Sequence, residues 1–76
     1  MKKLLSEKDL AMLAKRFREE AGKTRAEAAR EMDVSHVSIH RAEENPEESL
    51  TQLRTRMIET YSPFKVKGPV FYLERM

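Results

Sequence analysis

The side chains best suited to chemistry in this sequence lie in a predicted helix that begins after Ser35 and ends near Glu44. At ~100° per residue, one face of that helix collects four side chains that core packing does not require: His36, Val37, His40 and Arg41. Arginine can make two hydrogen bonds to guanine O6 and N7, histidine can donate to or accept from base edges, and valine can contact a thymine methyl. This face therefore has the composition expected of a surface that reads bases in the major groove of DNA.

Hydroxyl and cationic side chains stand at the starts of two predicted helices, where backbone N–H groups readily hold phosphate. Thr24 and Ser35 each precede such a helix, and Arg25 follows Thr24 directly. We assign contacts with DNA phosphates to four residues: Thr24, Arg25, Ser35 and Ser38. Arg54 and Arg56 can contact phosphate or pair with nearby glutamates, although surface arginines are more often simply solvated.

The pair His36 and His40 has a second interpretation, because two histidines four residues apart on a helix can hold a metal ion. The chain has no cysteine, no glutamate follows His36 directly, and a third ligand would have to come from another element or chain. We therefore favour DNA contact or solvent exposure for both, and we expect neither a metal nor a cofactor. An enzyme is not expected either, because no nucleophile accompanies a base and an orienting group.

Length and composition fit one small domain of 76 residues without disulfides. The formal net charge is only +2, but four glutamates fall within residues 43–48, and the rest of the chain has fifteen basic against nine acidic residues. This distribution is compatible with DNA binding if the acidic segment faces away from phosphate. No apolar run suits a membrane span or an export signal, so we expect a cytoplasmic protein with no membrane partner.

Capping residues and apolar spacing divide most of the chain into four predicted helices. The first is expected over residues 6–22, the second from Thr24, the third from Ser35 and the fourth over residues 49–61. Thr24 and Glu27 have the spacing of a capping box. The inward faces are expected to comprise Leu10, Leu13, Ala14, Phe17 and Ala21, then Ala28, Ala29 and Met32, then Ile39 and Ala42, and finally Leu50, Leu53, Met57, Ile58 and Tyr61.

Residues 62–76 change character. Two short runs, 64–67 and 70–73, are rich in aromatic and β-branched side chains and flank a glycine and a proline, which is typical of strands or a hairpin. An isolated hairpin is marginal in water, so it needs another surface. It can pack on the chain's own helices, or it can pair with a second subunit. In the second case the dimer contacts would be Val70, Phe71, Tyr72 and Leu73.

Several positions, taken together, carry a family resemblance: Phe17, Arg18, Gly22, Thr24, Glu27, Ala28, Ala29, Val34, Ser35, Ile39, Arg41 and Glu43. By these positions, residues 6–61 resemble the helix-turn-helix domains of the Cro and phage-repressor (Xre-type) family. The resemblance implies an all-α, lambda-repressor-like fold of about four helices with a short C-terminal strand or hairpin. Residues 1–61 would form the DNA-binding domain, and residues 62–76 would be a strand segment of the same domain that can form a dimer.

The resemblance also assigns roles to single residues. It implies base contacts at His36, Val37 and Arg41, and a phosphate contact at Arg25. It further implies a partly buried salt bridge between Arg18, on the first helix, and Glu43, at the end of the third. These assignments agree with the face of the third helix identified above.

One position and one short segment depart from the family pattern. Asp33 stands where the turn between the second and third helices usually has glycine, and aspartate tolerates left-handed backbone at a cost of ~1 kcal/mol. Residues 44–48 are acidic where relatives often place basic residues near DNA. We expect this segment to weaken DNA affinity or to turn away from the phosphates.

The sequence thus predicts a DNA-binding transcription regulator. Its form would be a Cro-like repressor that acts as a homodimer on a two-fold symmetric operator in double-stranded DNA. The alternative is an antitoxin or adaptor module whose main partner is another protein, such as a toxin. The acidic segment and the modest net charge favour the alternative, whereas the exposed face of the third helix favours the regulator.

Overall fold

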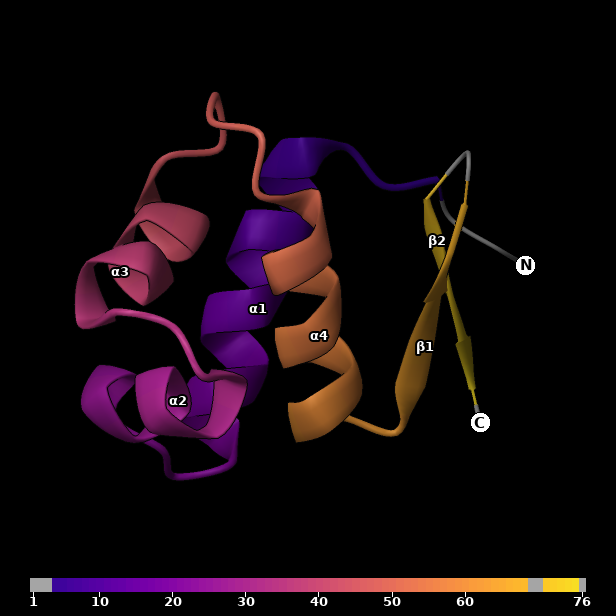
Figure 1. Cartoon of the computed structure of the whole chain (residues 1–76). Helices are drawn as coiled ribbons and strands as arrows, with labels where there is room; N and C mark the ends of the chain where they lie inside the picture. Colours follow the sequence, from indigo (N-terminus) through magenta and orange to yellow (C-terminus); the bar gives the residue numbers. More distant parts are fainter. Residues whose placement is uncertain (1–3, 69–70, 76) are drawn as a thin grey trace.

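The computed structural model describes residues 4–68 and 71–75, and these form four helices followed by an antiparallel hairpin (Figure 1). The helices are α1 (Glu7–Glu20), α2 (Arg25–Met32), α3 (His36–Glu44) and α4 (Thr51–Tyr61), and the strands are β1 (Phe64–Lys67) and β2 (Tyr72–Arg75). The predicted layout of four helices and a C-terminal hairpin is confirmed. In the described residues, every helix is too short or too polar to cross a membrane.

Local side-chain chemistry fixes where the first helices begin and end. Ser6 and Asp9 form a capping box at the start of α1, and Thr24 and Glu27 form the predicted one at α2. Asp33, with φ 58°, adopts the left-handed conformation that ends α2, as expected for this position. The resulting tight turn leads directly into α3.

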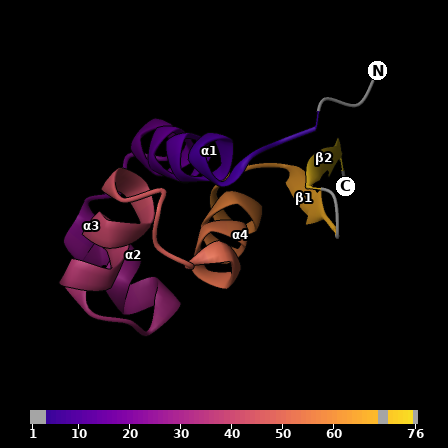
Figure 2. The ribbon, with the colours of Figure 1, turned by 90° about the horizontal axis from the view of Figure 1, so that it is seen from above.

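The core lies where α1 and α4 pack together, with α2 and α3 on one side and the hairpin on the other (Figures 1 and 2). Buried apolar side chains from all four helices fill it: Leu10, Ala14, Ala28, Ala29, Met32, Ile39, Ala42, Leu53, Met57 and Ile58. Alanines at positions 28 and 29 let α2 approach its neighbours closely. Because α3 contributes only Ile39 and Ala42 to this cluster, a single side of α3 is used for packing.

Two details of the helical prediction are wrong. The fourth helix begins at Thr51 and not at Ser49, and no side chain caps it. On α1, Ala21 is exposed, whereas Ala11, which the predicted stripe omits, is buried. The reason is that α1 ends at Glu20, so Ala21 lies in the turn that leaves the core.

The hairpin packs on the protein's own helices, which is the first of the two arrangements expected for it. Its strands pair antiparallel with Val66 opposite Leu73. Val66, Phe71 and Leu73 pack against the helical core, and the Phe64 ring lies 6.0 Å from the Phe17 ring. The hairpin therefore extends the core beyond α1 and α4.

The second strand begins later than predicted. It starts at Tyr72 and continues to Arg75, where the sequence pattern suggested residues 70–73. Of the four predicted dimer contacts, Tyr72 and Leu73 lie in β2 and Phe71 precedes it, all half-buried. Val70 lies outside the described residues.

Other parts of the chain bind backbone groups along the outer sides of the hairpin. The outward N–H groups of β1 are occupied by side chains, and that of Val66 donates to a Glu59 carboxylate oxygen at 3.0 Å. Because residues alternate in direction along an antiparallel ladder, Leu73, opposite Val66, also turns its backbone groups outward. The Phe71 carbonyl accepts a hydrogen bond from Leu5 N–H at 2.6 Å.

Candidate nucleic-acid interface

The outer side of α3 is open to solvent. All four residues predicted to contact bases are exposed there: His36, Val37, His40 and Arg41. Val37, an apolar residue, is 63% exposed, whereas Ile39 and Ala42 on the other side of the helix are fully buried. Core packing therefore uses one side of α3 and leaves the other free for a partner.

A shallow hollow of about 240 Å³ joins this face to the start of α2. It is lined by Arg25, His36, Val37 and His40. Arg25, which is predicted to contact phosphate, thus lies beside three residues that are predicted to contact bases. A nucleotide placed in the hollow would meet side chains from both helices.

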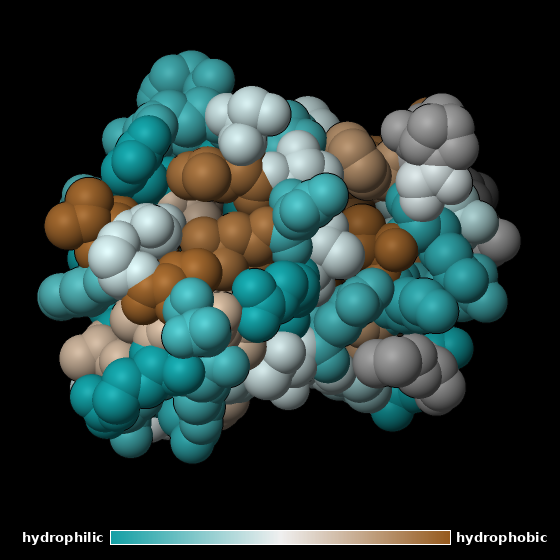
Figure 3. Space-filling view, viewed as in Figure 1, coloured by the Kyte–Doolittle hydropathy of each residue, from teal (hydrophilic) through white to brown (hydrophobic). Residues whose placement is uncertain are grey.

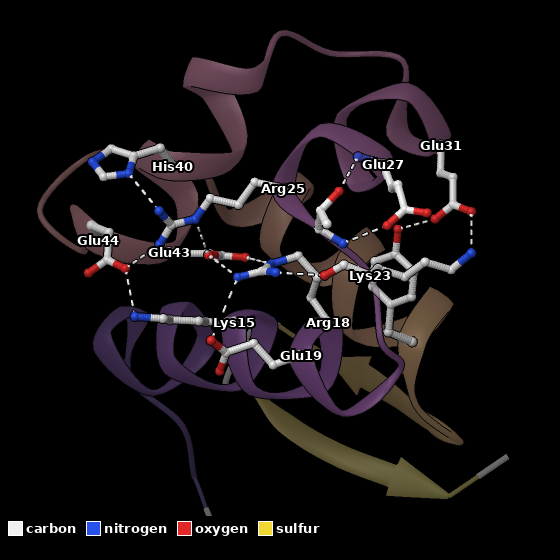
Figure 4. Close-up of polar contacts among 12 residues, drawn as sticks. Lys15, Arg18, Glu19, Lys23, Arg25, Glu27, Glu31, His40, Glu43 and Glu44 are labelled. Carbon is white, nitrogen blue, oxygen red and sulfur yellow. Dashed lines mark hydrogen bonds and ion pairs between the residues drawn. The ribbon is translucent and has the colours of Figure 1, made fainter.

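Arg25 does not extend freely into solvent but binds three groups of α3 (Figure 4). Its Nε lies 2.9 Å from Glu43 Oε1, and its Nη2 lies 2.6 Å from Glu44 Oε2. Its Nη1 lies 3.2 Å from His40 Nδ1, and the side chain is only 27% exposed. Arg25 therefore ties the start of α2 to α3, and a DNA phosphate would have to share or replace these partners.

The structure contains the ion pair predicted between Arg18 and Glu43. Arg18 Nε and Nη2 lie 2.6 and 3.1 Å from the two carboxylate oxygens of Glu43. Nη1 of Arg18 donates to the Lys23 carbonyl at 2.7 Å. Hydrogen bonding to Glu43 raises the pKa of Arg18, and the Glu43 side chain is fully buried. The pair holds the end of α3 against α1 (Figure 4).

Arg41 is bound by a carboxylate from the loop that follows α3. Its Nε lies 2.8 and 3.1 Å from the two Glu48 oxygens, and its Nη2 also donates to Glu48. Asn45 Nδ2 donates to the same carboxylate at 2.7 Å. The hydrogen bonds from Arg41 and then Asn45 lower the pKa of Glu48 to about 2. Glu48 therefore stays negatively charged near neutral pH, and the pair with Arg41 is present there.

Two of the three hydroxyls predicted to contact phosphate, those of Thr24 and Ser35, act as helix caps. Thr24 Oγ1 accepts from Glu27 N–H at 3.1 Å, and Ser35 Oγ accepts from Ser38 N–H at 3.1 Å. Ser35 Oγ also lies 2.9 Å from Ser38 Oγ. Thr24 and Ser35 are exposed, and Ser38 is half-buried. Because capping uses a hydroxyl as an acceptor, the exposed Thr24 hydroxyl can still donate to a phosphate.

A second hollow, of about 560 Å³, opens beside α3 at the start of α4. Its lining combines apolar side chains with hydroxyls and one arginine: Val34, Ser38, Ser49, Leu50, Thr51, Gln52, Leu53 and Arg56. Figure 3 shows apolar surface gathered between α3 and α4, with hydrophilic side chains around it. Arg56 is exposed at this hollow, so it remains a candidate for phosphate contact.

Arg54, expected at the surface, is completely buried. Its Nε donates to the Ala42 carbonyl at 2.8 Å, and its Nη groups donate to the carbonyls of Asn45 at 2.7 Å and Glu48 at 2.9 Å. Its Nη1 also lies 2.7 Å from Glu7 Oε1. Arg54 therefore fixes the loop between α3 and α4, which carries Glu48, and it is not placed to touch DNA.

The two histidines of α3 do not gather further ligands. Within residues 4–68 and 71–75, no cluster of three or more histidine, cysteine, aspartate or glutamate side chains is placed to hold a metal ion.

Comparison of the chain with protein-family models, curated proteins and solved structures gave no match.

Proposed function

We propose that α2 and α3 form a helix-turn-helix of the Cro and phage-repressor type and that the protein is a sequence-specific DNA-binding transcription regulator. One observation carries the proposal: core packing leaves free a side of α3 that bears His36, Val37, His40 and Arg41. Such a helix fits the major groove, and these side chains can bond to base edges. Arg25 and the capped start of α2 stand beside it, where contacts with phosphate would position the protein.

We further propose that the protein acts as a homodimer and represses transcription by occupying an operator. A two-fold dimer places its α3 helices in successive major grooves, roughly 34 Å apart. The hairpin lies at the opposite end of the fold from α3 (Figure 1), which supports a dimer formed through β2 that leaves the free side of α3 uncovered. In that arrangement Tyr72 and Leu73 would lie at the interface.

Selection of bound duplexes from a random DNA pool, at a stated salt concentration, tests the proposal. We expect enrichment of a consensus made of two inverted half-sites, because a two-fold dimer reads the same bases twice. Failure to enrich any sequence over several rounds would contradict the regulator function. An enriched consensus without inverted symmetry would contradict the dimer alone.

Replacing Arg41 with alanine should cost roughly 1–3 kcal/mol of binding free energy on the selected duplex and relax the preference at one base pair. The physical reason is the loss of a side chain that can form two hydrogen bonds with guanine. Titration of the selected duplex and of single-base variants of it, followed by fluorescence anisotropy, measures both effects.

Arg25→Ala provides the contrasting variant. It should weaken binding to selected and mixed-sequence duplexes alike and reduce the salt slope by about one unit, because phosphate contacts release counterions. Thermal melting must accompany this measurement, since Arg25 also binds the buried Glu43. If both variants lose affinity equally on both kinds of DNA, the division between base and phosphate contacts is wrong.

An antitoxin or adaptor whose partner is another protein is the second candidate. The observation that favours it is the occupation of Arg25 and Arg41 by the chain's own glutamates. A protein with this function can fail to select any DNA sequence while keeping its fold. The selection experiment therefore separates the two candidates.

A further inference from the structure

Two arginines of the proposed DNA interface hold carboxylates that come from the same stretch of chain. Arg25 binds Glu44, the last residue of α3, and Arg41 binds Glu48 in the loop that follows. The second contact is the more complete, because Arg41 uses both Nε and Nη2 on one carboxylate. A carboxylate bound in this way occupies the donors that would bind a phosphate or the edge of guanine.

The loop that carries Glu48 is held in place at its backbone. Buried Arg54 donates to the carbonyls of Asn45 and Glu48, and the Asn45 side chain donates to the Glu48 carboxylate. Glu48 N–H also donates to the Asn45 carbonyl at 3.0 Å. These contacts fix the position from which Glu48 reaches Arg41. The carboxylate therefore cannot leave with a swing of the whole loop unless the buried contacts of Arg54 break.

Since Arg41 is exposed and α3 is otherwise free on this side, DNA and Glu48 would meet at the same guanidinium. We propose that Glu48 is an intramolecular competitor for Arg41, so that DNA binding requires exchange of the Arg41–Glu48 contact for a contact with DNA. The proposal rests on the function proposed above. In this proposal Glu48 sets the DNA affinity, because its carboxylate binds the same guanidinium that would contact DNA. An ion pair elsewhere on the surface would not have this effect.

Glu48→Gln should strengthen binding to the selected duplex, and Glu47→Gln is the matched control. Both substitutions remove one negative charge from the same loop, but Glu47 is exposed and has no ion pair among the described residues. The control therefore measures the general effect of removing a charge that repels phosphate. We expect the Glu48→Gln variant to bind the selected duplex about two- to fivefold more tightly than the Glu47→Gln variant. This difference corresponds to the loss of one exposed ion pair.

A double-mutant cycle with Arg41→Ala decides whether the effect passes through Arg41. In the Arg41→Ala background, Glu48→Gln and Glu47→Gln should have equal effects on affinity, because the competition no longer exists. The affinities are measured on the selected duplex and on a mixed-sequence duplex at several salt concentrations.

Three results would overturn the proposal while leaving the DNA-binding function intact. One is equal affinity of the Glu48→Gln and Glu47→Gln variants. Another is persistence of their difference in the Arg41→Ala background. The third is weaker binding by Glu48→Gln, which would mean that Glu48 positions Arg41 for DNA. If neither the parent protein nor Glu48→Gln binds any duplex, both proposals fail, whereas binding by Glu48→Gln alone supports both.

Discussion

Replacing Arg54 with methionine should lower the free energy of unfolding by about 3–5 kcal/mol, the range expected when one partner of a buried charged network is removed. Arg54 is completely buried and donates to the carbonyls of Ala42, Asn45 and Glu48 as well as to Glu7. Methionine fills much of the same space but offers no donor. Three carbonyls and one carboxylate would each lose a hydrogen bond, and the Ala42 carbonyl would be left buried without its donor, which is costly. The carbonyls of Asn45 and Glu48 would each keep one backbone donor.

Urea denaturation followed by circular dichroism measures this loss, with Arg56→Met as the control. Arg56 lies on the same helix but is exposed, so its replacement should change stability by no more than about 0.5 kcal/mol. The free energy of unfolding of a domain of this size is often only ~3–5 kcal/mol, so the Arg54→Met variant should be largely unfolded in buffer. The Arg54→Lys variant keeps the positive charge but has fewer hydrogen-bond donors. It should lose less of the free energy of unfolding than Arg54→Met, and this loss should be measurable. Equal stabilities of the Arg54→Met and Arg56→Met variants would show that the hydrogen bonds of Arg54 to the loop between α3 and α4 do not stabilise the fold.

Arg18→Met should cost about 3 kcal/mol of stability, because it leaves the buried Glu43 carboxylate with Arg25 as its remaining partner. The substitution also removes the donor to the Lys23 carbonyl in the turn after α1. Arg16→Met is the matched control, since Arg16 lies on the same helix in an exposed pair with Glu20. It should have almost no effect.

A double variant tests whether the cost arises from an unpaired charge. Removing both Arg18 and Glu43, each replaced by methionine, should restore stability to within about 1 kcal/mol of the parent protein, because apolar pairs often replace buried ion pairs without loss. Thermal melting of the parent, the two single variants and the double variant completes the cycle. Additive losses in the double variant would show that the two side chains act separately.

Much of the fold follows from short-range chemistry that can be seen in the sequence. The pairs Ser6–Asp9 and Thr24–Glu27 specify where α1 and α2 begin, because each needs only residues three apart. Asp33 is one of the few non-glycine types that suits the left-handed end of α2. The free side of α3 also follows from helical spacing, since Ile39 and Ala42 identify the buried side.

Contacts that depend on a loop conformation could not be predicted in the same way. Arg54 lies four residues from both Leu50 and Ile58, on the apolar side of α4, and this spacing signals that its stem is buried. Apart from the Glu7 carboxylate, however, its partners are backbone carbonyls, which no residue type identifies. The pair between Arg41 and Glu48 spans a loop whose path is set only once those carbonyls are bound.

One outer edge of the hairpin is closed to further strands. The outward N–H groups of Phe64 and Val66 in β1 already donate to Ser62 and Glu59. A strand is added to a sheet only where the backbone groups of the edge can accept it, so a second molecule cannot extend the sheet through β1. Indefinite growth of a fibre through this hairpin would need two receptive edges in every molecule, and β1 does not provide one.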